Sequence, residues 1–366
     1  MNAQQAFKAL SLNISHKRRD SLEQTISQDT EFSFRYAQFV IEGRFELGEE
    51  AISQSAIWSF FYARDVIQGR WEPGEEAISK YVNIAFAYAY AVIEGRFEPG
   101  EAAISKDHVW SLHYASDVIQ GRWEPGEAAI SQCAECAADY AEGVIRGRWE
   151  PGEAAISKDA EPSLRYARDV IKRRFKLGEA AICQDAECSL KYARDVLKRR
   201  FKLGEAAISR LSYWAIVYSR QVIGGRFKLC EPAIIQDAEA AYKYADQVIQ
   251  GRWKLGENVI CSDAQQAYKY ALNVIGRRFP PGEAAISKSE HAFQYAKHLS
   301  RENWTRKLAM MCPCWLYLYA KDVIKGRLPT RLHNQMLAFG MIDSSDKYVR
   351  TYLGSKKYQV KKKTEF

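Results

Sequence analysis

The stretch DAEPSLRYARDVIKRRFKLGEAAI, residues 159–182, decides the fold of this chain of 366 residues. The same phrase recurs at a spacing of 26 residues along most of the sequence. Its tyrosine stands at Tyr36, Tyr62, Tyr88, Tyr114, Tyr140, Tyr166, Tyr192, Tyr218, Tyr244 and Tyr270. A fixed period of this length indicates a repeat architecture, in which each unit packs mainly on its two neighbours.

Each copy predicts two helices. The first begins near an aspartate, a good N-cap residue, as at Asp107, Asp159, Asp185, Asp237 and Asp263. The apolar positions of one helix face follow at Tyr166, Ala167, Val170, Ile171 and Phe175. A glycine such as Gly147 often comes next, and glycine is typical of the left-handed residue that ends a helix. Residues 179–182 are then expected to form the short second helix.

One such unit cannot bury its own apolar face, whereas stacked neighbours can. The sequence therefore predicts an all-α, right-handed α-solenoid of about a dozen two-helix repeats with degenerate terminal caps. Residues 1–28 are expected to form a degenerate N-terminal repeat or cap, in which Arg18 and Glu23 stand one period before Arg44 and Glu49. The other expected segments are ten strict repeats at 29–288, two phase-shifted repeats at 289–328, and a C-terminal cap with a basic tail at 329–366.

The repeat pattern is expected to dissolve at Leu332, which stands where other copies carry glutamate. The sequence has no apolar run of about 18 residues, so we expect no membrane span. The first residues also lack the apolar region and the cleavage site of a signal peptide. These observations predict a cytoplasmic protein.

The eight cysteines allow two interpretations. Cys133 and Cys136 have the C-x-x-C spacing of redox and zinc sites, but no second pair of cysteines or histidines is placed to complete a metal site. His108 and His113 share a copy but are five residues apart, which does not suit two ligands on one helix face. We therefore favour free structural thiols in a reducing compartment, and we predict no metal, no cofactor and no enzymatic activity.

An arginine eight residues after the tyrosine and a glutamate thirteen after it recur together. Examples are Arg148, Glu153, Arg174, Glu179, Arg200 and Glu205. The arginines could bind phosphates in a row, or each could pair with a glutamate of its own or the next copy and brace the turn. We favour bracing, because a glutamate column would repel phosphate. The aromatic residue after each arginine could stack on bases, but we favour a place in the core.

Charge varies in an organised way along the chain. Ten residues after the tyrosine, five successive copies carry Glu46, Glu72, Glu98, Glu124 and Glu150, and the next four carry Lys176, Lys202, Lys228 and Lys254. Residues 1–165 contain 16 Lys and Arg against 26 Asp and Glu, whereas residues 166–366 contain 37 against 19. Such ladders of like charge could steer a charged partner, or block duplication of one copy could have spread the lysines without selection for binding.

The phrase Tyr-Ala-x-x-Val-Ile-x-Gly-Arg-Trp/Phe, followed by Gly-Glu-x-x-Ile, resembles short helical repeats of uncharacterised phage, large-virus and metagenomic proteins. The resemblance covers residues 3–328 and implies the same helical fold, but it brings no established activity. The period of 26 differs from the roughly 34 residues of tetratricopeptide repeats, so their peptide-binding residues do not transfer.

Two functions remain open from the sequence. The first is a non-catalytic scaffold or inhibitor that binds another protein along an extended surface. The second is nucleic-acid binding by the basic C-terminal half. For both, the candidate partner-binding residues are Lys172, Arg173, Lys176, Lys198, Arg199, Lys202, Lys228 and Lys254. We expect a monomer at physiological salt, since exposed ion pairs between the oppositely charged halves are individually worth only about 0–1 kcal/mol.

Overall fold

The protein is described by a computed structural model, which covers residues 2–10, 16–299, 313–343 and 345–359. These residues form helices and turns and contain no β-strand. The chain divides into two compact units, Met1–Gln184 and Asp185–Phe366. Each unit is a succession of two-helix repeats about 26 residues long, so the prediction of an α-solenoid is confirmed.

The first unit opens with α1 (Ala3–Leu10) and α2 (His16–Ile26). The first helices of its repeats are α3 (Thr30–Tyr36), α5 (Ala56–Phe61), α7 (Val82–Tyr88), α9 (His108–His113), α11 (Ala134–Asp139) and α13 (Ala160–Arg165). Each continues directly into a π-helical segment, for example Tyr140–Ile145 and Tyr166–Val170. The second helices are α4 (Glu49–Ser53), α6 (Glu75–Ser79), α8 (Glu98–Ile104), α10 (Glu124–Ile130), α12 (Glu150–Ile156) and α14 (Glu179–Ile182).

The second unit repeats this order. Its first helices are α15 (Ala186–Lys191), α17 (Ser212–Tyr218), α19 (Ala238–Tyr244), α21 (Ala264–Lys269), α23 (Ala292–Leu299) and α24 (Pro313–Leu318). Its second helices are α16 (Glu205–Arg210), α18 (Glu231–Ile234), α20 (Glu257–Ile260) and α22 (Glu283–Ile286). The helices α25 (Thr330–Ile342), α26 (Lys347–Gly354) and α27 (Lys356–Gln359) follow.

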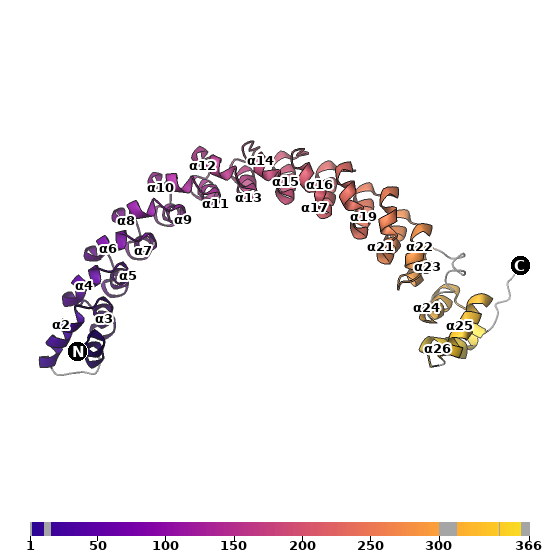
Figure 1. Cartoon of the computed structure of the whole chain (residues 1–366), viewed down its shortest axis with the longest axis horizontal. Helices are drawn as coiled ribbons and strands as arrows, with labels where there is room; N and C mark the ends of the chain where they lie inside the picture. Colours follow the sequence, from indigo (N-terminus) through magenta and orange to yellow (C-terminus); the bar gives the residue numbers. More distant parts are fainter. Residues whose placement is uncertain (1, 11–15, 300–312, 344, 360–366) are drawn as a thin grey trace. The chain divides into compact units, whose positions relative to one another are not determined.

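Within each unit the helices form two layers. In the first unit the odd-numbered helices from α3 to α13 lie in one layer, and the even-numbered helices from α4 to α14 lie in the other (Figure 1). In the first unit α9 contacts α10, the second helix of its own copy, and α7 and α11, the first helices of the adjoining copies. The core between the layers is a column of tyrosines, of which Tyr140 and Tyr166 are fully buried. No helix among the described residues is both long and apolar enough to cross a membrane.

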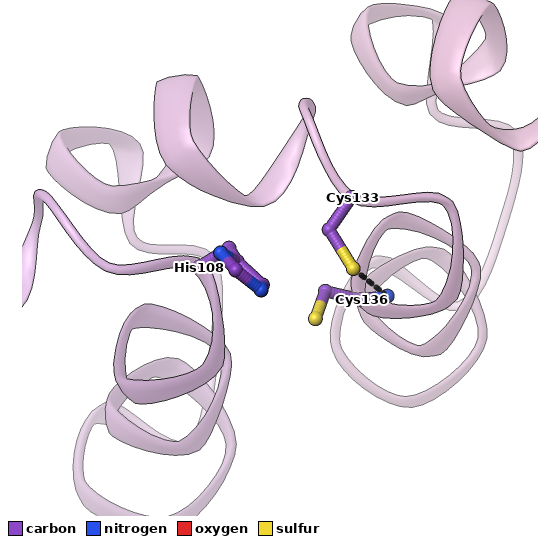
Figure 2. A group of neighbouring side chains, drawn as sticks. All are labelled: His108, Cys133 and Cys136. Carbon is purple, nitrogen blue, oxygen red and sulfur yellow. Dashed lines mark hydrogen bonds between the residues drawn. The ribbon is translucent and has the colours of Figure 1, made fainter.

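The expected aspartate caps are present, with one informative exception. Asp185, Asp237 and Asp263 each accept a hydrogen bond from the backbone N–H three residues later. Asp159 occupies the same N-cap position but makes no such bond, because the residue three later is Pro162, which has no N–H. Cys133 replaces the aspartate in its copy, and its Sγ accepts from the N–H of Cys136 at 3.4 Å (Figure 2).

The first helix ends one residue earlier than the sequence suggested. The left-handed residue lies immediately before the recurrent glycine, as Gln120 lies before Gly121 with φ of 54°. Its long polar side chain points to solvent, and the N–H of Gly121 donates to the carbonyl of Ala115 at 3.1 Å. The left-handed conformation does not need the glycine, since Lys172 and Lys198 adopt it in two copies that carry arginine at the glycine position.

The apolar stripe is divided between two elements. Tyr166 and Ala167 are buried on the first helix, whereas Val170 and Ile171 are only half-buried. Phe175 is buried but lies beyond the left-handed Lys172, on the extended connection that leads into the second helix. The expected placement of Phe175 on the first helix face is therefore wrong, because the left-handed residue has already ended that helix.

Both terminal regions depart from the expected register. In the first copy Arg19, rather than Arg18, pairs with Glu23 at 2.9 Å. At the other end the polar pattern does not dissolve at Leu332. Instead, the backbone N–H of Leu328 donates to the hydroxyl of Tyr352 at 2.9 Å, and His333 Nδ1 lies 3.0 Å from the same hydroxyl. A histidine one position later thus takes the place of the missing glutamate.

Replacing Tyr166 with alanine should lower the free energy of unfolding by roughly 3–5 kcal/mol, the usual cost of truncating a buried aromatic side chain. Tyr213→Ala is the matched control, because Tyr213 lies in another first helix but is 67% exposed. Urea unfolding followed by circular dichroism measures both. A change within a few tenths of a kcal/mol for Tyr166→Ala would contradict the placement of the tyrosine column in the core.

Candidate functional site

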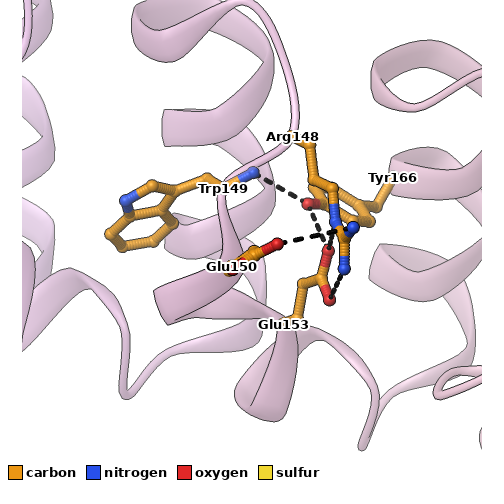
Figure 3. Close-up of polar contacts among 5 residues, drawn as sticks. All are labelled: Arg148, Trp149, Glu150, Glu153 and Tyr166. Atoms are coloured by element: carbon orange, nitrogen blue, oxygen red, sulfur yellow. Dashed lines mark hydrogen bonds and ion pairs between the residues drawn. The ribbon is translucent and has the colours of Figure 1, made fainter.

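The recurrent arginine and glutamate form a two-pronged ion pair within each copy. In the Tyr140 copy, Arg148 Nε lies 2.7 Å from Glu153 Oε1 and its Nη2 lies 3.1 Å from Oε2 (Figure 3). The equivalent pairs are Arg44–Glu49, Arg70–Glu75, Arg96–Glu101, Arg122–Glu127, Arg174–Glu179, Arg200–Glu205, Arg226–Glu231, Arg252–Glu257 and Arg278–Glu283. Both partners belong to one copy, and their parallel bonds fix the turn between its two helices.

The tyrosine of the next copy completes this arrangement. Tyr166 donates its hydroxyl proton to Glu153 Oε1 at 3.0 Å and accepts from the backbone N–H of Trp149 at 2.9 Å. We call this set of arginine, glutamate, backbone N–H and following tyrosine the repeat network. Because Tyr166 lies one copy further along the chain, the repeat network links consecutive copies as well as the helices of one copy.

Burial and hydrogen bonding set the protonation states in the repeat network. Burial by itself raises the pKa of Glu153, but hydrogen bonds from Arg148 and Tyr166 outweigh this effect and lower the pKa below its ordinary value. Burial also raises the pKa of Tyr166 to about 12, against a smaller opposing effect of the Trp149 N–H. The carboxylate is therefore ionised and the tyrosine neutral at physiological pH.

The repeat network occupies the groups that could otherwise have bound nucleic acid. Across the ten pairs the glutamate side chains are 0–15% exposed and the arginines 40–58%, so each guanidinium already faces a carboxylate. The aromatic side chain after each arginine is buried, as are Trp149 and Phe201. In the described part of the chain the indole N–H groups of Trp71, Trp123, Trp149 and Trp253 have no hydrogen-bond partner, so phenylalanine can replace tryptophan there without losing a bond.

The charge switch occurs beside the exposed side of these arginines. In the acidic copies a glutamate adds a second carboxylate, and Glu150 Oε1 lies 3.4 Å from Arg148 Nη1. In the second unit an exposed lysine occupies that position, at Lys202, Lys228 and Lys254. Each copy therefore changes by two charge units at one surface position, while its buried ion pair stays the same.

The candidate partner-binding residues of each unit are exposed. In the first unit Arg173 and Lys176, with Arg148 and Arg174, line a hollow of about 370 Å³, and Lys172 is the exposed left-handed residue beside it. In the second unit Lys198 and Arg199 lie at the end of one first helix. Three lysines stand at equivalent places in successive copies of this unit, namely Lys202, Lys228 and Lys254, and we call them the lysine ladder.

A row of exposed leucines, which was not predicted from the sequence, lies next to the lysine ladder. Leu203, Leu229 and Leu255 each follow a ladder lysine and are 61%, 54% and 52% exposed. We call these three residues the leucine row. The signal was present in the sequence, because proline occupies this position in four of the five acidic copies, as at Pro99 and Pro125, and the exposed Leu47 occupies it in the first. Lys176 and Leu177 repeat the same exposed pair in the first unit.

The cysteines bear out the expectation of free thiols at six positions, which are Cys133, Cys136, Cys183, Cys188, Cys230 and Cys261. Cys314 is an exception, because it is disulfide-bonded. The sequence showed no second pair of cysteines or histidines for the C-x-x-C pair, but a single histidine of another copy lies beside it. His108 of the preceding copy brings a ring nitrogen within 4.8 Å of both sulfurs (Figure 2). Burial, and then an interaction between its side chain and that of Cys133, raise the pKa of Cys136 to about 12.

No protein-family model, curated protein or solved structure matches this chain. No relative therefore assigns a role to the repeat network, the lysine ladder or the cysteine pair, and their interpretation depends on their own geometry and chemistry.

The raised tyrosine pKa values predict a steep alkaline transition. Tyr88, Tyr140, Tyr166, Tyr218 and Tyr270 shift from 10.0 to about 12, so the unfolded chain loses these protons at lower pH than the folded chain. This stabilisation is complete below pH 10 and is lost as the pH rises toward 12. As the pH is raised, the absorbance of tyrosinate from these buried tyrosines should therefore increase over the same pH range in which the helical circular dichroism signal decreases. Ionisation of these tyrosines near pH 10 with the helices intact would contradict their burial.

Proposed function

We propose that the protein is a non-catalytic scaffold or inhibitor, and that it binds another protein through the lysine ladder and the leucine row. The partner surface that fits is acidic with apolar side chains between its carboxylates. The observation that carries this proposal is the pairing of an exposed lysine with an exposed leucine in three successive copies, Lys202 with Leu203, Lys228 with Leu229, and Lys254 with Leu255.

The leucine row favours a protein over a nucleic acid. Exposed aliphatic side chains gain free energy when a protein partner buries them, roughly 25 cal/mol for each Å² of apolar surface. They offer nothing to a phosphate backbone, and sequence-tolerant binding of single strands usually needs exposed aromatic side chains. The aromatic residues of this region, Phe201, Phe227 and Trp253, are only 3–4% exposed and are not free to stack on bases.

Nucleic-acid binding is the second candidate, and the basic hollow of the first unit favours it. Arg148 and Arg174 line this hollow but are already paired with Glu153 and Glu179. Arg173 and Lys176 add two further positive charges, enough to attract one or two phosphates. A single hollow is a small footprint, since stable binding to a nucleic acid usually neutralises several phosphates.

The proposal is tested by capture on the immobilised full chain, using nuclease-treated extract of the cells that make it. One protein should be retained in a stoichiometric amount. Retention should be lost in Lys202→Glu/Lys228→Glu/Lys254→Glu and reduced at least tenfold in Leu203→Pro/Leu229→Pro/Leu255→Pro. Proline is a conservative replacement here, because Pro281 occupies the equivalent place in a helical turn of the same geometry.

The matched control is Glu72→Lys/Glu98→Lys/Glu124→Lys, which makes the same number of charge reversals at the same repeat position. This variant should retain the partner. The proposal would be contradicted if the lysine-ladder variant and the leucine-row variant both captured as much partner as the unmodified chain. Recovery of no protein even at low salt would also contradict it.

Labelled DNA and RNA, tested on the same full-length variants at two salt concentrations, distinguish the second candidate. We expect weak binding that is indifferent to the leucine substitutions. Tight binding that falls steeply with salt and is lost in Arg173→Gly/Lys176→Glu would instead establish the nucleic-acid role. Glycine is the residue that Gly147 supplies at this position in the preceding copy.

A further inference from the structure

Three metal-ligating side chains converge where two neighbouring copies of the first unit meet. His108 is the first residue of α9, Cys133 is the N-cap of α11, and Cys136 lies in the first turn of α11. One histidine nitrogen and the two sulfurs all lie within 4.8 Å of one another (Figure 2). The helices α9 and α11 are in contact, so the packing of the repeats brings His108 close to cysteines that lie 25 and 28 residues later in the sequence.

His108 and Cys133 are exceptions at their repeat positions, whereas the position of Cys136 varies among copies and carries cysteine again at Cys188. Where Cys133 stands, Asp107, Asp159 and Asp185 stand in other copies; where His108 stands, most copies carry alanine, as at Ala134 and Ala160. Only the Tyr140 copy has cysteine at both positions, and only the preceding copy has the histidine. Two departures from the repeat pattern, His108 and Cys133, thus meet at one interface beside Cys136.

We propose that His108, Cys133 and Cys136 form a zinc site that joins these two copies. Two thiolates and one imidazole are the ligands that Zn²⁺ prefers, with Zn–S bonds of about 2.3 Å and Zn–N bonds of about 2.0–2.1 Å. A tetrahedral ion with these bonds holds its ligand atoms about 3.5–3.8 Å apart. The ligand atoms therefore have to approach one another by about 1.3 Å at most, and rotation of the exposed His108 side chain can contribute to this approach.

The local structure suits a bound ion. The N–H of Cys136 already donates to Cys133 Sγ at 3.4 Å, and a bond of this kind stabilises a thiolate. Cys136 is buried, Cys133 is half-buried and His108 is exposed, so the ion has a route from solvent and one enclosed side. Three protein ligands leave the fourth position of the ion open to water or to a ligand atom from a partner.

Binding of Zn²⁺ releases the thiol protons, and the affinity should therefore rise with pH. Because one ligand comes from the copy before the other two, the ion also acts as a staple between copies. It should raise the thermal stability of the folded chain as Zn²⁺ is added, since a ligand that binds only the folded state stabilises that state.

To test this proposal, the full chain is reduced and freed of metal with a chelator. It is then titrated with Zn²⁺ in competition with a chromogenic chelator, which measures the affinity. A separate titration with Co²⁺ reports the coordination geometry through its absorption spectrum. The unmodified chain should bind one Zn²⁺ at this site, and Co²⁺ should give the thiolate charge-transfer band of a tetrahedral site. His108→Ala, Cys133→Ser and Cys136→Ala should each lower the affinity by more than about 10–100-fold, the effect of losing only an outer-shell partner. All three substitutions introduce residues that other copies carry at these positions, at Ala134, Ser55 and Ala240.

Cys188→Ala is the matched control, because Cys188 occupies the position of Cys136 in another copy whose N-cap residue is Asp185. This variant should bind Zn²⁺ with unchanged affinity and show the same rise in melting temperature. The proposal is overturned if the reduced chain binds no Zn²⁺, or if the three ligand variants bind it as tightly as the unmodified chain. Uptake of Cu⁺ without Zn²⁺ would overturn the assignment of the ion.

Discussion

The buried tyrosine hydroxyl is the interaction on which the rest of the structure depends. Tyr166 is fully buried, and its hydroxyl connects the carboxylate of Glu153 with the backbone N–H of Trp149 in the preceding copy. A buried N–H without a partner costs about 1–3 kcal/mol. Repeating this bond in successive copies therefore makes each copy depend on the next, which is the physical basis of a solenoid that grows by one unit at a time.

A constant internal network leaves the outer positions free to change. The arginine–glutamate pair is the same beside Glu150 in an acidic copy and beside Lys202 in a basic one. Proline and leucine likewise exchange beside these residues, because the first turn of a helix needs no N–H from this position. Surface charge and apolar exposure can thus vary copy by copy without disturbing the core, and the lysine ladder, the leucine row and the His108 cluster are all variations of this kind.

The sequence predicted the two-helix repeat, the aspartate caps and the buried tyrosines, because each depends on contacts repeated at a fixed spacing. It placed the left-handed residue at glycine instead of at residues such as Gln120, since long polar side chains adopt this conformation less readily and give no compositional signal. The hydrogen bond between His333 and Tyr352 was not predicted, because a histidine makes the contact instead of a glutamate and lies one position later than the glutamate of other copies.

The candidate sites were harder to predict than the fold. The lysines were recognised from their own column, but the exposure of Leu203 was missed, although proline stands at the equivalent position of acidic copies such as the one with Pro125. His108 was compared only with His113 on its own helix, whereas its neighbours in space are cysteines one copy away. A contact between two copies can be predicted from the sequence only when the number of residues that separates the packed positions is known. For His108 and Cys133 this separation is 25 residues.

Native-state hydrogen exchange at the Trp149 amide tests the role of the repeat network most directly. In Tyr166→Phe the N–H of Trp149 loses its acceptor, so its exchange should accelerate about 5- to 150-fold, which corresponds to about 1–3 kcal/mol. The N–H of Trp123 donates to the unaltered Tyr140 at 2.9 Å. Its exchange rate in the variant should therefore change less than that of Trp149. Equal exchange at Trp149 in the variant and the unmodified chain would contradict the claim that the tyrosine hydroxyl holds consecutive copies together.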